Sequence, residues 1–370
     1  MTLSDRLSVR IDAVRRGLEV VDAAVAVFGL SSNLRYLTGF TDEPGERMLL
    51  LLVPRDREAT FIVPELYAGQ VEAVFPAASL RVWADGETPD ALLTEIADSL
   101  GRVSGEILLD DSLWSVFVLR VQAAFPGRSF GLASAVMAPL RERKDALEIA
   151  AMKHAGEIAD RAFAAVTARP ISGLTEIELA GRLEAAMLAG GADGIGFATL
   201  VAAGPNSALP HHRAGTRRIE PGDVVILDYG CRVDGYCSDI TRTVVCGTPT
   251  PELERVHAAV RNAHLAARDR VAIGVRAEEV DAAARNVLVA AGYGDRFVHR
   301  TGHGIGLDVH EPPYIVRGNE QRLEEGMAFS IEPGAYFGGR FGVRIEDVVV
   351  VGEDGGVPMT EAPQGLRNVE

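Results

Sequence analysis

The chain has 370 residues, of which 47% are hydrophobic and 24% charged, so it has ordinary globular composition and room for one large domain or two. No uninterrupted apolar run approaches the roughly 18 residues of a membrane helix, and residues 1–20 lack the apolar core of a secretory signal, so the cytoplasm is the expected location. A net charge of −15 disfavours nucleic acid as a partner, and three cysteines without CxxC spacing fit neither a disulfide framework nor a thiolate zinc site.

The first third of the chain alternates between strand-like and helix-like segments. Apolar runs typical of strands occupy residues 25–28, 48–53 and 60–63, and a helical pattern follows over 64–74. This alternation predicts an α/β domain. The pattern breaks at Pro139 and becomes charged, so we place a domain boundary near residue 140, with domains at 1–140 and 141–370.

The second domain contains four predicted helices separated by β-rich stretches. Apolar residues recur at helical spacing over 145–169, and a capping box of Thr175 and Glu178 opens a helix over 175–189. Thr250 and Pro251 open a third helix, and residues 276–290 form a fourth. We expect helices packed on a largely antiparallel sheet, which is an α+β arrangement.

A weak internal repeat in the second domain contains its candidate functional carboxylates. Residues 222–230 (GDVVILDYG) and 326–334 (GMAFSIEPG) share a glycine, five mostly apolar residues, a carboxylate and a second glycine two residues later. These carboxylates are Asp228 and Glu332. Each unit continues through a turn into a second strand with a second carboxylate, Asp239 or Glu346. Two related hairpins would bring all four carboxylates together.

Four carboxylates on apolar strands need neutralisation. Burial and mutual repulsion both oppose their charged forms, and divalent cations remove both costs. Oxygen-rich ligation with one imidazole suits Mn²⁺, Co²⁺, Fe²⁺ or Zn²⁺, and four carboxylates can bridge two ions. For Asp239 the sequence leaves an alternative open, because it can equally form a structural salt bridge with Arg242.

His303 is the candidate imidazole, and it lies in a glycine-rich segment, residues 301–306 (TGHGIG). Glycines there allow close backbone approach. A phosphate-binding loop is excluded, because no Lys-Ser/Thr pair follows and no strand leads into a helix; the dinucleotide-binding fingerprint fails for the same reason.

Several short sequence motifs accompany the four carboxylates and His303. They are GPNS at 204–207, Pro210-His211, GYCSDITRT at 235–243, GHGIG at 302–306, HEPP at 310–313 and IEPG at 331–334. In this order they resemble the pita-bread (M24) metallopeptidases, over roughly residues 145–360, and within that family the Xaa-Pro dipeptidase (prolidase) and Xaa-Pro aminopeptidase branch. Residues 33–40 (NLRYLTGF) are similar to the opening of the creatinase-like domain that precedes the catalytic domain in this branch. The expected fold is therefore α+β, with a C-terminal pita-bread (creatinase/aminopeptidase-like) catalytic domain behind a smaller α/β creatinase-like N-terminal domain.

The resemblance implies two divalent metal ions in each chain, with Mn²⁺ the first choice and Co²⁺, Zn²⁺ or Fe²⁺ as alternatives. Asp228 would bind one ion, His303 and Glu332 the other, and Asp239 and Glu346 both. The implied reaction is hydrolysis of the Xaa-Pro bond of short peptides by a metal-bridging hydroxide. Glu332 would also accept and donate the proton.

The resemblance further implies two histidines in the substrate cleft, His211 and His310. His212 competes with His211 for the first position, and we favour His211, since adjacent residues of an extended segment point opposite ways. Arg344, two residues before Glu346, is expected on the same strand face, where it either orients the carboxylates or serves as a salt-bridge partner. A homodimer is expected, and no membrane partner.

Three questions stay open on sequence alone. Dipeptidase and aminopeptidase are not separated, since the residue that would recognise a substrate's C-terminal carboxylate is not identified. A second hypothesis is a related-fold hydrolase of a small non-peptide amide or amidine, similar to creatinase or ectoine hydrolase. A third is a non-enzymatic binding protein of the same fold.

Overall fold

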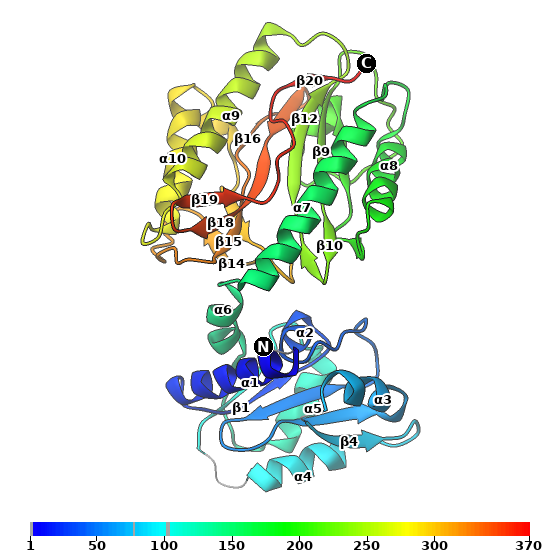
Figure 1. Cartoon of the computed structure of the whole chain (residues 1–370), viewed down its shortest axis with the longest axis vertical. Coiled ribbons are helices and arrows are strands. Elements are labelled where there is room, and N and C mark those ends of the chain that lie inside the picture. Colours follow the sequence, from blue (N-terminus) through cyan, green and yellow to red (C-terminus); the bar gives the residue numbers. More distant parts are fainter. Residues whose placement is uncertain (1–2, 77, 101–103) are drawn as a thin grey trace. The chain divides into compact units, whose positions relative to one another are not determined.

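The computed structural model describes residues 3–76, 78–100 and 104–370, and the chain divides into two compact units, Met1–Arg141 and Glu142–Glu370 (Figure 1). The strands of the first unit are β1 (Ala23–Phe28), β2 (Leu50–Pro54), β3 (Thr60–Pro64), β4 (Ser79–Trp83), β5 (Glu106–Leu109) and β6 (Phe130–Leu132). Its helices are α1 (Leu3–Val20), α2 (Ser32–Thr38), α3 (Glu65–Val74), α4 (Asp90–Leu100), α5 (Ser115–Ala124) and α6 (Ser134–Arg141).

The first unit is built on a mixed six-stranded sheet in the order β4-β3-β2-β1-β5-β6. Strand β1 is buried along its whole length, pairing antiparallel with β2 and parallel with β5. Helices α4 and α5 pack on the sheet through Leu93, Ile96, Phe117 and Val121. The alternation of helices and strands confirms the predicted α/β class for this unit.

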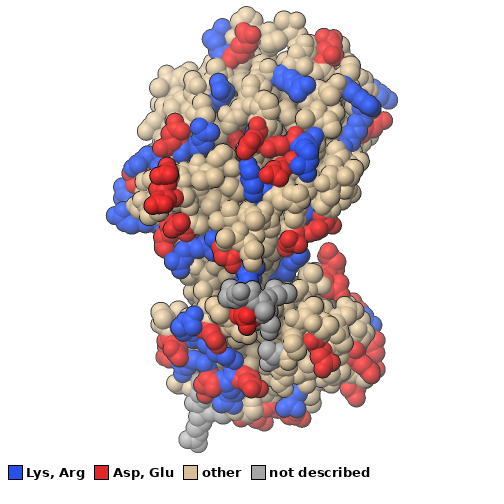
Figure 2. All heavy atoms as spheres, in the orientation of Figure 1, with Lys and Arg blue, Asp and Glu red and all other residues tan. Residues whose placement is uncertain are grey.

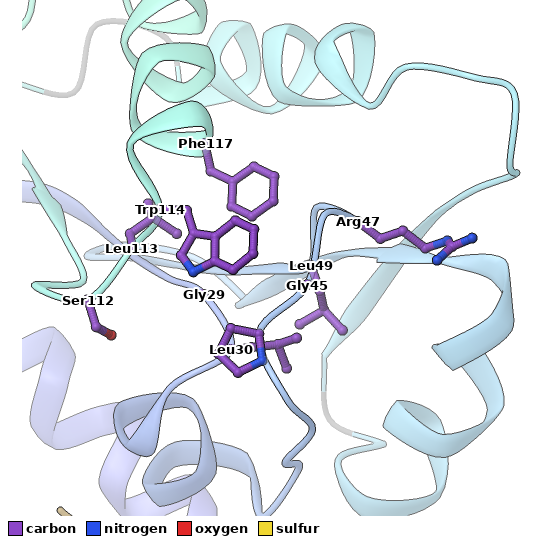
Figure 3. A pocket seen from close by; sticks show the side chains of 10 residues that line it. Gly29, Leu30, Gly45, Arg47, Leu49, Ser112, Leu113, Trp114 and Phe117 are labelled. Atoms are coloured by element: carbon purple, nitrogen blue, oxygen red, sulfur yellow. The ribbon is translucent and has the colours of Figure 1, made fainter.

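A small hollow lies at one end of this sheet (Figure 3). Trp114 and Phe117 stack with ring centroids 6.1 Å apart, and Gly29, Leu30 and Leu49 line the same hollow. Its volume is about 20 Å³, which leaves room for roughly one water molecule. It is therefore too small for a peptide substrate.

The second unit carries one large sheet with four long helices. Its main strands are β8 (Leu200–Ala203), β9 (Val224–Tyr229), β12 (Ile240–Val245), β13 (Gly302–Gly304), β14 (Glu311–Ile315), β15 (Ala328–Ile331), β18 (Glu346–Gly352), β19 (Gly355–Pro358) and β20 (Arg367–Asn368). Shorter strands are β7 (Gly194–Ile195), β10 (Cys231–Val233), β11 (Tyr236–Cys237), β16 (Gly334–Phe337) and β17 (Phe341–Arg344). The helices are α7 (Ala146–Val166), α8 (Glu176–Ala189), α9 (Pro251–Arg270) and α10 (Ala277–Ala290), with short 3₁₀ turns η1 (Gly204–Ala208) and η2 (Gly294–Arg296).

The large sheet runs β14-β13-β15-β18-β12-β9-β8, and each neighbouring pair in this order is antiparallel, as the sequence predicts. Helices α7 and α8 pack on the half that contains β8, β9 and β12. Helices α9 and α10 pack on the half that contains β15 and β18 (Figure 1). Strands β12 and β18 join the two halves, so the internal repeat of the sequence corresponds to two similar half-sheets.

The ends of the predicted helices follow local chemistry. Thr175 and Glu178 form the predicted capping box of α8, with Glu178 Oε2 accepting from the Thr175 amide at 2.7 Å. Thr250 caps α9, and Pro251 is its first residue. The helix predicted over 145–169 extends one residue before and three residues beyond α7, because Asp145 is its N-cap and Thr167 its C-cap.

The repeat departs from prediction in one respect. A two-stranded excursion, β10–β11 or β16–β17, lies between the two main strands of each half, where a simple turn was expected. At Gly230 the chain folds so tightly that a Cβ would lie 1.9 Å from the Ser238 carbonyl oxygen. The excursion therefore returns Asp239 to the neighbourhood of Asp228.

Surface charge is distributed on both units, and Figure 2 shows acidic and basic side chains on the visible face of each. Exposed ion pairs such as Lys153–Glu361, at 2.9 Å, contribute little to stability. Among the described residues, no helix combines the length and apolar character needed to cross a membrane.

Candidate metal centre

The alternation of side chains along β9 directs Asp228 away from the helices. Val225, Leu227 and Tyr229 pack in the core beneath α7 and α8. Ile226 packs in a separate cluster. Because successive side chains of a strand point to opposite faces, Asp228 shares the face of Ile226.

The second half of the sheet repeats this arrangement. Phe329 and Ile331 of β15 pack in the core beneath α9 and α10, as does Val349 of β18. Glu332 directly follows Ile331, and Glu346 lies three residues before Val349, so both have the opposite parity from the core residues. The apolar positions of each strand thus place the carboxylates on the face opposite the helices.

Three neighbouring strands bring Asp228 and Glu346 together across Thr241. Thr241 of β12 pairs with Asp228 on one side and with Glu346 on the other. Its hydroxyl donates to Glu346 Oε2 at 2.6 Å and accepts from Arg344 Nε at 3.2 Å. Arg344 also donates to Asp228 Oδ2. One oxygen of each carboxylate is therefore fixed by the protein.

His303 completes the cluster. Ligand atoms of Asp239, His303 and Glu346 all lie within 4.8 Å of one another, and all three residues are buried. His303 Nε2 is 3.8 Å from Asp239 Oδ2 and 3.6 Å from Glu332 Oε1. Since His303 Nδ1 lies 3.1 Å from the Gly304 carbonyl, Nδ1 carries the hydrogen and the Nε2 lone pair faces the carboxylates.

The glycines around His303 are required by close backbone approach. A Cβ on Gly302 would lie 1.8 Å from the Ser330 carbonyl oxygen, and one on Gly304 would lie 2.2 Å from the Pro312 carbonyl oxygen. The Ser330 hydroxyl accepts from the His303 amide at 3.1 Å. The glycine-rich segment therefore forms a strand packed closely between its neighbours.

The electrostatics of the cluster favour the binding of a cation. Burial, followed by the charge of Glu346, raises the pKa of Asp239 well above its usual value, and burial likewise raises the pKa of Glu346. Burial raises the pKa of Glu332 to about 7 and lowers that of His303 to about 3. Asp239 Oδ1 has no hydrogen-bond partner among the described residues although it is buried. Buried oxygens short of positive charge beside a neutral imidazole are the donor set that divalent metal ions prefer.

The alternative pairing of Asp239 with Arg242 is wrong. Arg242 lies on the opposite face of β12, where Nη2 is 2.6 Å from Asp347 Oδ1 and 2.7 Å from the Ala362 carbonyl. His264 Nε2 of α9 is 3.2 Å from the other oxygen of Asp347. Burial opposes ionisation of Asp347, yet Arg242 and His264 hold its pKa below the usual range. Arg242 thus belongs to a structural network beneath the sheet.

The three candidate cleft histidines occupy different surroundings. His310 lies against His303, with ring centroids 4.1 Å apart, and the residue is nevertheless exposed. His212 Nε2 bonds Glu176 Oε2 at 2.8 Å. His211 is exposed, and its charge lowers the pKa of His310, after the larger effects of burial and Arg300. This arrangement leaves His211 available to a substrate and His212 occupied by Glu176.

Glu176 organises the segment that carries these histidines. The residue is wholly buried at the start of α8. Besides His212, its carboxylate accepts hydrogen bonds from the Ala203 amide, the Asn206 side chain and the Gly215 amide. Sequence reasoning missed this role, because Glu176 reads as an ordinary acidic residue in the first turn of a helix.

The expected position of Arg344 was also wrong in part. Arg344 ends β17 whereas Glu346 begins β18, so they do not share a strand face. Arg344 is buried and its Nη1 donates to the Tyr336 hydroxyl at 3.0 Å, which in turn lies 2.9 Å from His299 Nε2. Sequence reasoning did not find Tyr336 or His299.

An antiparallel α+β domain with two similar halves, gathering four carboxylates and one imidazole on one face, defines a class of metal-dependent hydrolases. The model of metallopeptidase family M24 matches residues 150–353, and that of the creatinase/prolidase N-terminal domain matches residues 10–143. The chain therefore belongs to metallopeptidase family M24, with divalent metal as its cofactor. The expected pita-bread domain behind a creatinase-like N-terminal domain is confirmed.

Relatives match over nearly the whole chain. "Probable dipeptidase PepE" of Mycobacterium tuberculosis is 40% identical over 362 residues, 95% of each chain. "Xaa-Pro dipeptidase" of Lactobacillus delbrueckii subsp. lactis is 34% identical over 360 residues, covering 96% of this chain and 98% of that one. The crystal structure of a prolidase from Thermococcus sibiricus superimposes with a TM-score of 0.93 at 40% identity, covering 97% of this chain and 98% of that one.

Proposed function

We propose that this metallopeptidase hydrolyses the Xaa-Pro bond of short peptides, as a dipeptidase, with two divalent metal ions. The observation that carries the proposal is the convergence of buried carboxylates whose pKa values are raised, around a neutral His303. The full-length similarity to proteins named dipeptidase, Xaa-Pro dipeptidase and prolidase supports the choice of substrate.

The cluster offers enough ligands for two ions. Asp228 would bind one ion, and His303 with Glu332 the other. Asp239 and Glu346, whose ligand atoms lie within 4.8 Å of each other and of His303, would contact both. Bound ions of this kind supply an activated water near neutral pH and a Lewis acid for the scissile carbonyl. Mn²⁺ is our first choice of metal, since carboxylate oxygen predominates in the donor set.

Glu332 suits the proton transfers. Its pKa of about 7, before any metal binds, allows it to hold or release a proton near neutral pH. Hydrolysis of an Xaa-Pro bond releases a secondary amine, which must gain a proton. Glu332 would accept a proton from the attacking water and return it to this nitrogen.

His310 and His211 would orient the substrate. Burial lowers the pKa of His310, so its imidazole is neutral near pH 7 and can donate one hydrogen bond to a peptide carbonyl. His211, which is exposed on the segment fixed by Glu176, can contact the same substrate from another element. These histidines therefore position the peptide.

The direct test measures metal content and hydrolysis in the same preparations. We expect Asp239→Ala and Glu346→Ala to lose stoichiometric metal, by elemental mass spectrometry, and hydrolysis of Ala-Pro. Asp354→Ala is the matched control, because Asp354 is exposed and follows Glu346 on the next turn. Full activity of metal-depleted Asp239→Ala would sink the proposal.

The substrate range is tested separately. Wild-type protein loaded with Mn²⁺, Co²⁺ or Zn²⁺ is compared on Ala-Pro and Ala-Pro-Ala, and we expect cleavage of the dipeptide with little of the tripeptide. A panel including creatine and an ectoine-type amide addresses the rival small-molecule hydrolase; turnover of those compounds alone would replace the proposal. Light scattering during gel filtration tests the expected homodimer.

A further inference from the structure

A lysine is buried at the start of the second unit and forms an ion pair there. Only two of the 37 basic residues Lys and Arg are lysines, Lys144 and Lys153, and Lys144 is buried. Its Nζ donates to Glu311 Oε1 at 2.7 Å, and the two side chains are only 1% and 6% exposed. The same Nζ donates to the Glu142 carbonyl at 3.3 Å. Because desolvation offsets most of the attraction within a buried ion pair, stability alone does not account for it.

Two glycines of the site motifs make room for this lysine. A Cβ on Gly306, the last residue of GHGIG, would lie 2.7 Å from Glu311 Oε1 and 3.0 Å from Lys144 Cε. A Cβ on Gly326, which opens the second copy of the repeat and has a φ of +80°, would lie 2.7 Å from the Lys144 carbonyl oxygen. The Lys144 amide also donates to the Gly326 carbonyl at 2.8 Å. The two motifs that contain proposed metal ligands are therefore both shaped around Lys144.

The partner of this lysine is joined directly to His310, one of the two proposed cleft histidines. Glu311 begins β14, and residues 305–310 before it form neither helix nor strand. Among the described residues, none hydrogen-bonds the His310 side chain, so the ring is placed by its backbone and by its contact with His303. Successive side chains of an extended chain point opposite ways, and here Glu311 is buried whereas His310 is exposed. Holding Glu311 inward therefore directs His310 outward.

We propose that Lys144 is a positioning residue for His310 and acts through Glu311. The proposal rests on the proposed function, in which His310 orients the peptide. Lys144 and Glu311 are 167 residues apart in the chain, so their pair ties the segment before α7 to the segment that presents His310. Without the ammonium group, the Glu311 carboxylate is buried and unpaired, and it must move toward water or take up a proton. Either change releases the residue next to His310, whose ring then loses its fixed approach to the substrate.

The kinetic test is a double-mutant cycle that joins Lys144 to His310. Lys144→Met, His310→Ala and the variant with both changes are assayed beside wild type on Ala-Pro, and metal content is measured for each. We expect Lys144→Met to lower kcat/KM about 30-fold at unchanged metal content, as a misplaced orienting group does. In the His310→Ala background the same substitution should lower kcat/KM less than about threefold. Equal losses in both backgrounds would overturn the proposal, because a merely structural lysine acts alike in both.

Two further variants separate positioning from stability. Lys153→Met is the matched control, since Lys153 forms a surface ion pair with Glu361 and its replacement should leave kcat/KM unchanged. If Lys144→Met does not fold, Lys144→Met/Glu311→Gln takes its place in the same cycle, because this variant leaves no unpaired charge buried. The same dependence on His310 is expected, and a loss that is independent of His310 counts against the proposal as before.

The position of His310 can also be followed without substrate. In metal-free protein that carries isotope-labelled histidine, the nuclear magnetic resonance signals of the His310 ring are assigned by their loss in His310→Ala. We expect Lys144→Met to shift or broaden these signals, while those of the exposed His154 stay unchanged. Unchanged His310 signals would overturn the inference even if activity falls. Wild type that does not cleave Ala-Pro would overturn the proposed function alone, and the His310 signals would then decide whether Lys144 positions this ring.

Discussion

Neutralising Glu332 should stabilise the metal-free protein, in contrast to most substitutions of buried residues. The pKa of Glu332 is raised from 4.5 to about 7, chiefly by burial, so its ionised form is disfavoured in the folded state. The contribution of Glu332 to the free energy of unfolding is fully present below pH 4.5 and is lost as the pH rises through 7. At about 1.4 kcal/mol per pKa unit, Glu332→Gln should raise the free energy of unfolding by about 3 kcal/mol at pH 8, and by less than about 1 kcal/mol at pH 5.

The measurement is urea denaturation of chelator-treated protein at both pH values. Both tryptophans, Trp83 and Trp114, lie in the first unit, so fluorescence follows that unit and circular dichroism adds the second. Glu325→Gln is the control, since Glu325 is exposed and its replacement should have little effect. Addition of Mn²⁺ should make wild type more stable than Glu332→Gln, because wild type gains more free energy from binding the metal. A stabilisation of equal size at pH 5 and pH 8 would refute the reasoning.

Three further substitutions probe the supporting residues. Arg242→Met leaves Asp347 buried without its partner and should lower the free energy of unfolding by about 3–5 kcal/mol, measured by chemical denaturation; a loss below about 1 kcal/mol would contradict a structural role. Arg344→Met frees Asp228 and should weaken metal binding about 10- to 100-fold by calorimetry, and unchanged affinity would exclude an orienting role. Glu176→Gln should lower kcat/KM about 10- to 100-fold at unchanged metal content, because the segment that carries His211 and His212 loses the carboxylate that holds it. Unchanged kinetics would show that Glu176 is not needed to position this segment.

Much of the fold follows from local patterns. The helices of the second unit begin where the sequence places their caps, as Thr175 and Thr250 show. The repeat around Asp228 and Glu332 predicted two related halves, and the antiparallel sheet contains them. These features depend on short stretches of sequence, where side-chain periodicity and capping chemistry are sufficient.

The details of the site depend on contacts between distant segments. Sequence could not show that Thr241 stands between Asp228 and Glu346, because strand register is set by packing. One error was avoidable. Asp239 and Arg242 are three residues apart, and strand alternation alone would have placed their side chains on opposite faces.

The pairing of β12 with β18, which joins the two halves of the large sheet, has a consequence for biosynthesis. Thr241 and Glu346, which meet there, are 105 residues apart in the chain. Contacts of such separation form late, because closing a long loop costs entropy before any contact repays it. Asp228 and Asp239 leave the ribosome well before Glu332 and Glu346, so an emerging chain at first has only two of the five proposed ligands. The full set of proposed ligands is therefore assembled only when the second unit has folded, and metal uptake can report that this folding is complete.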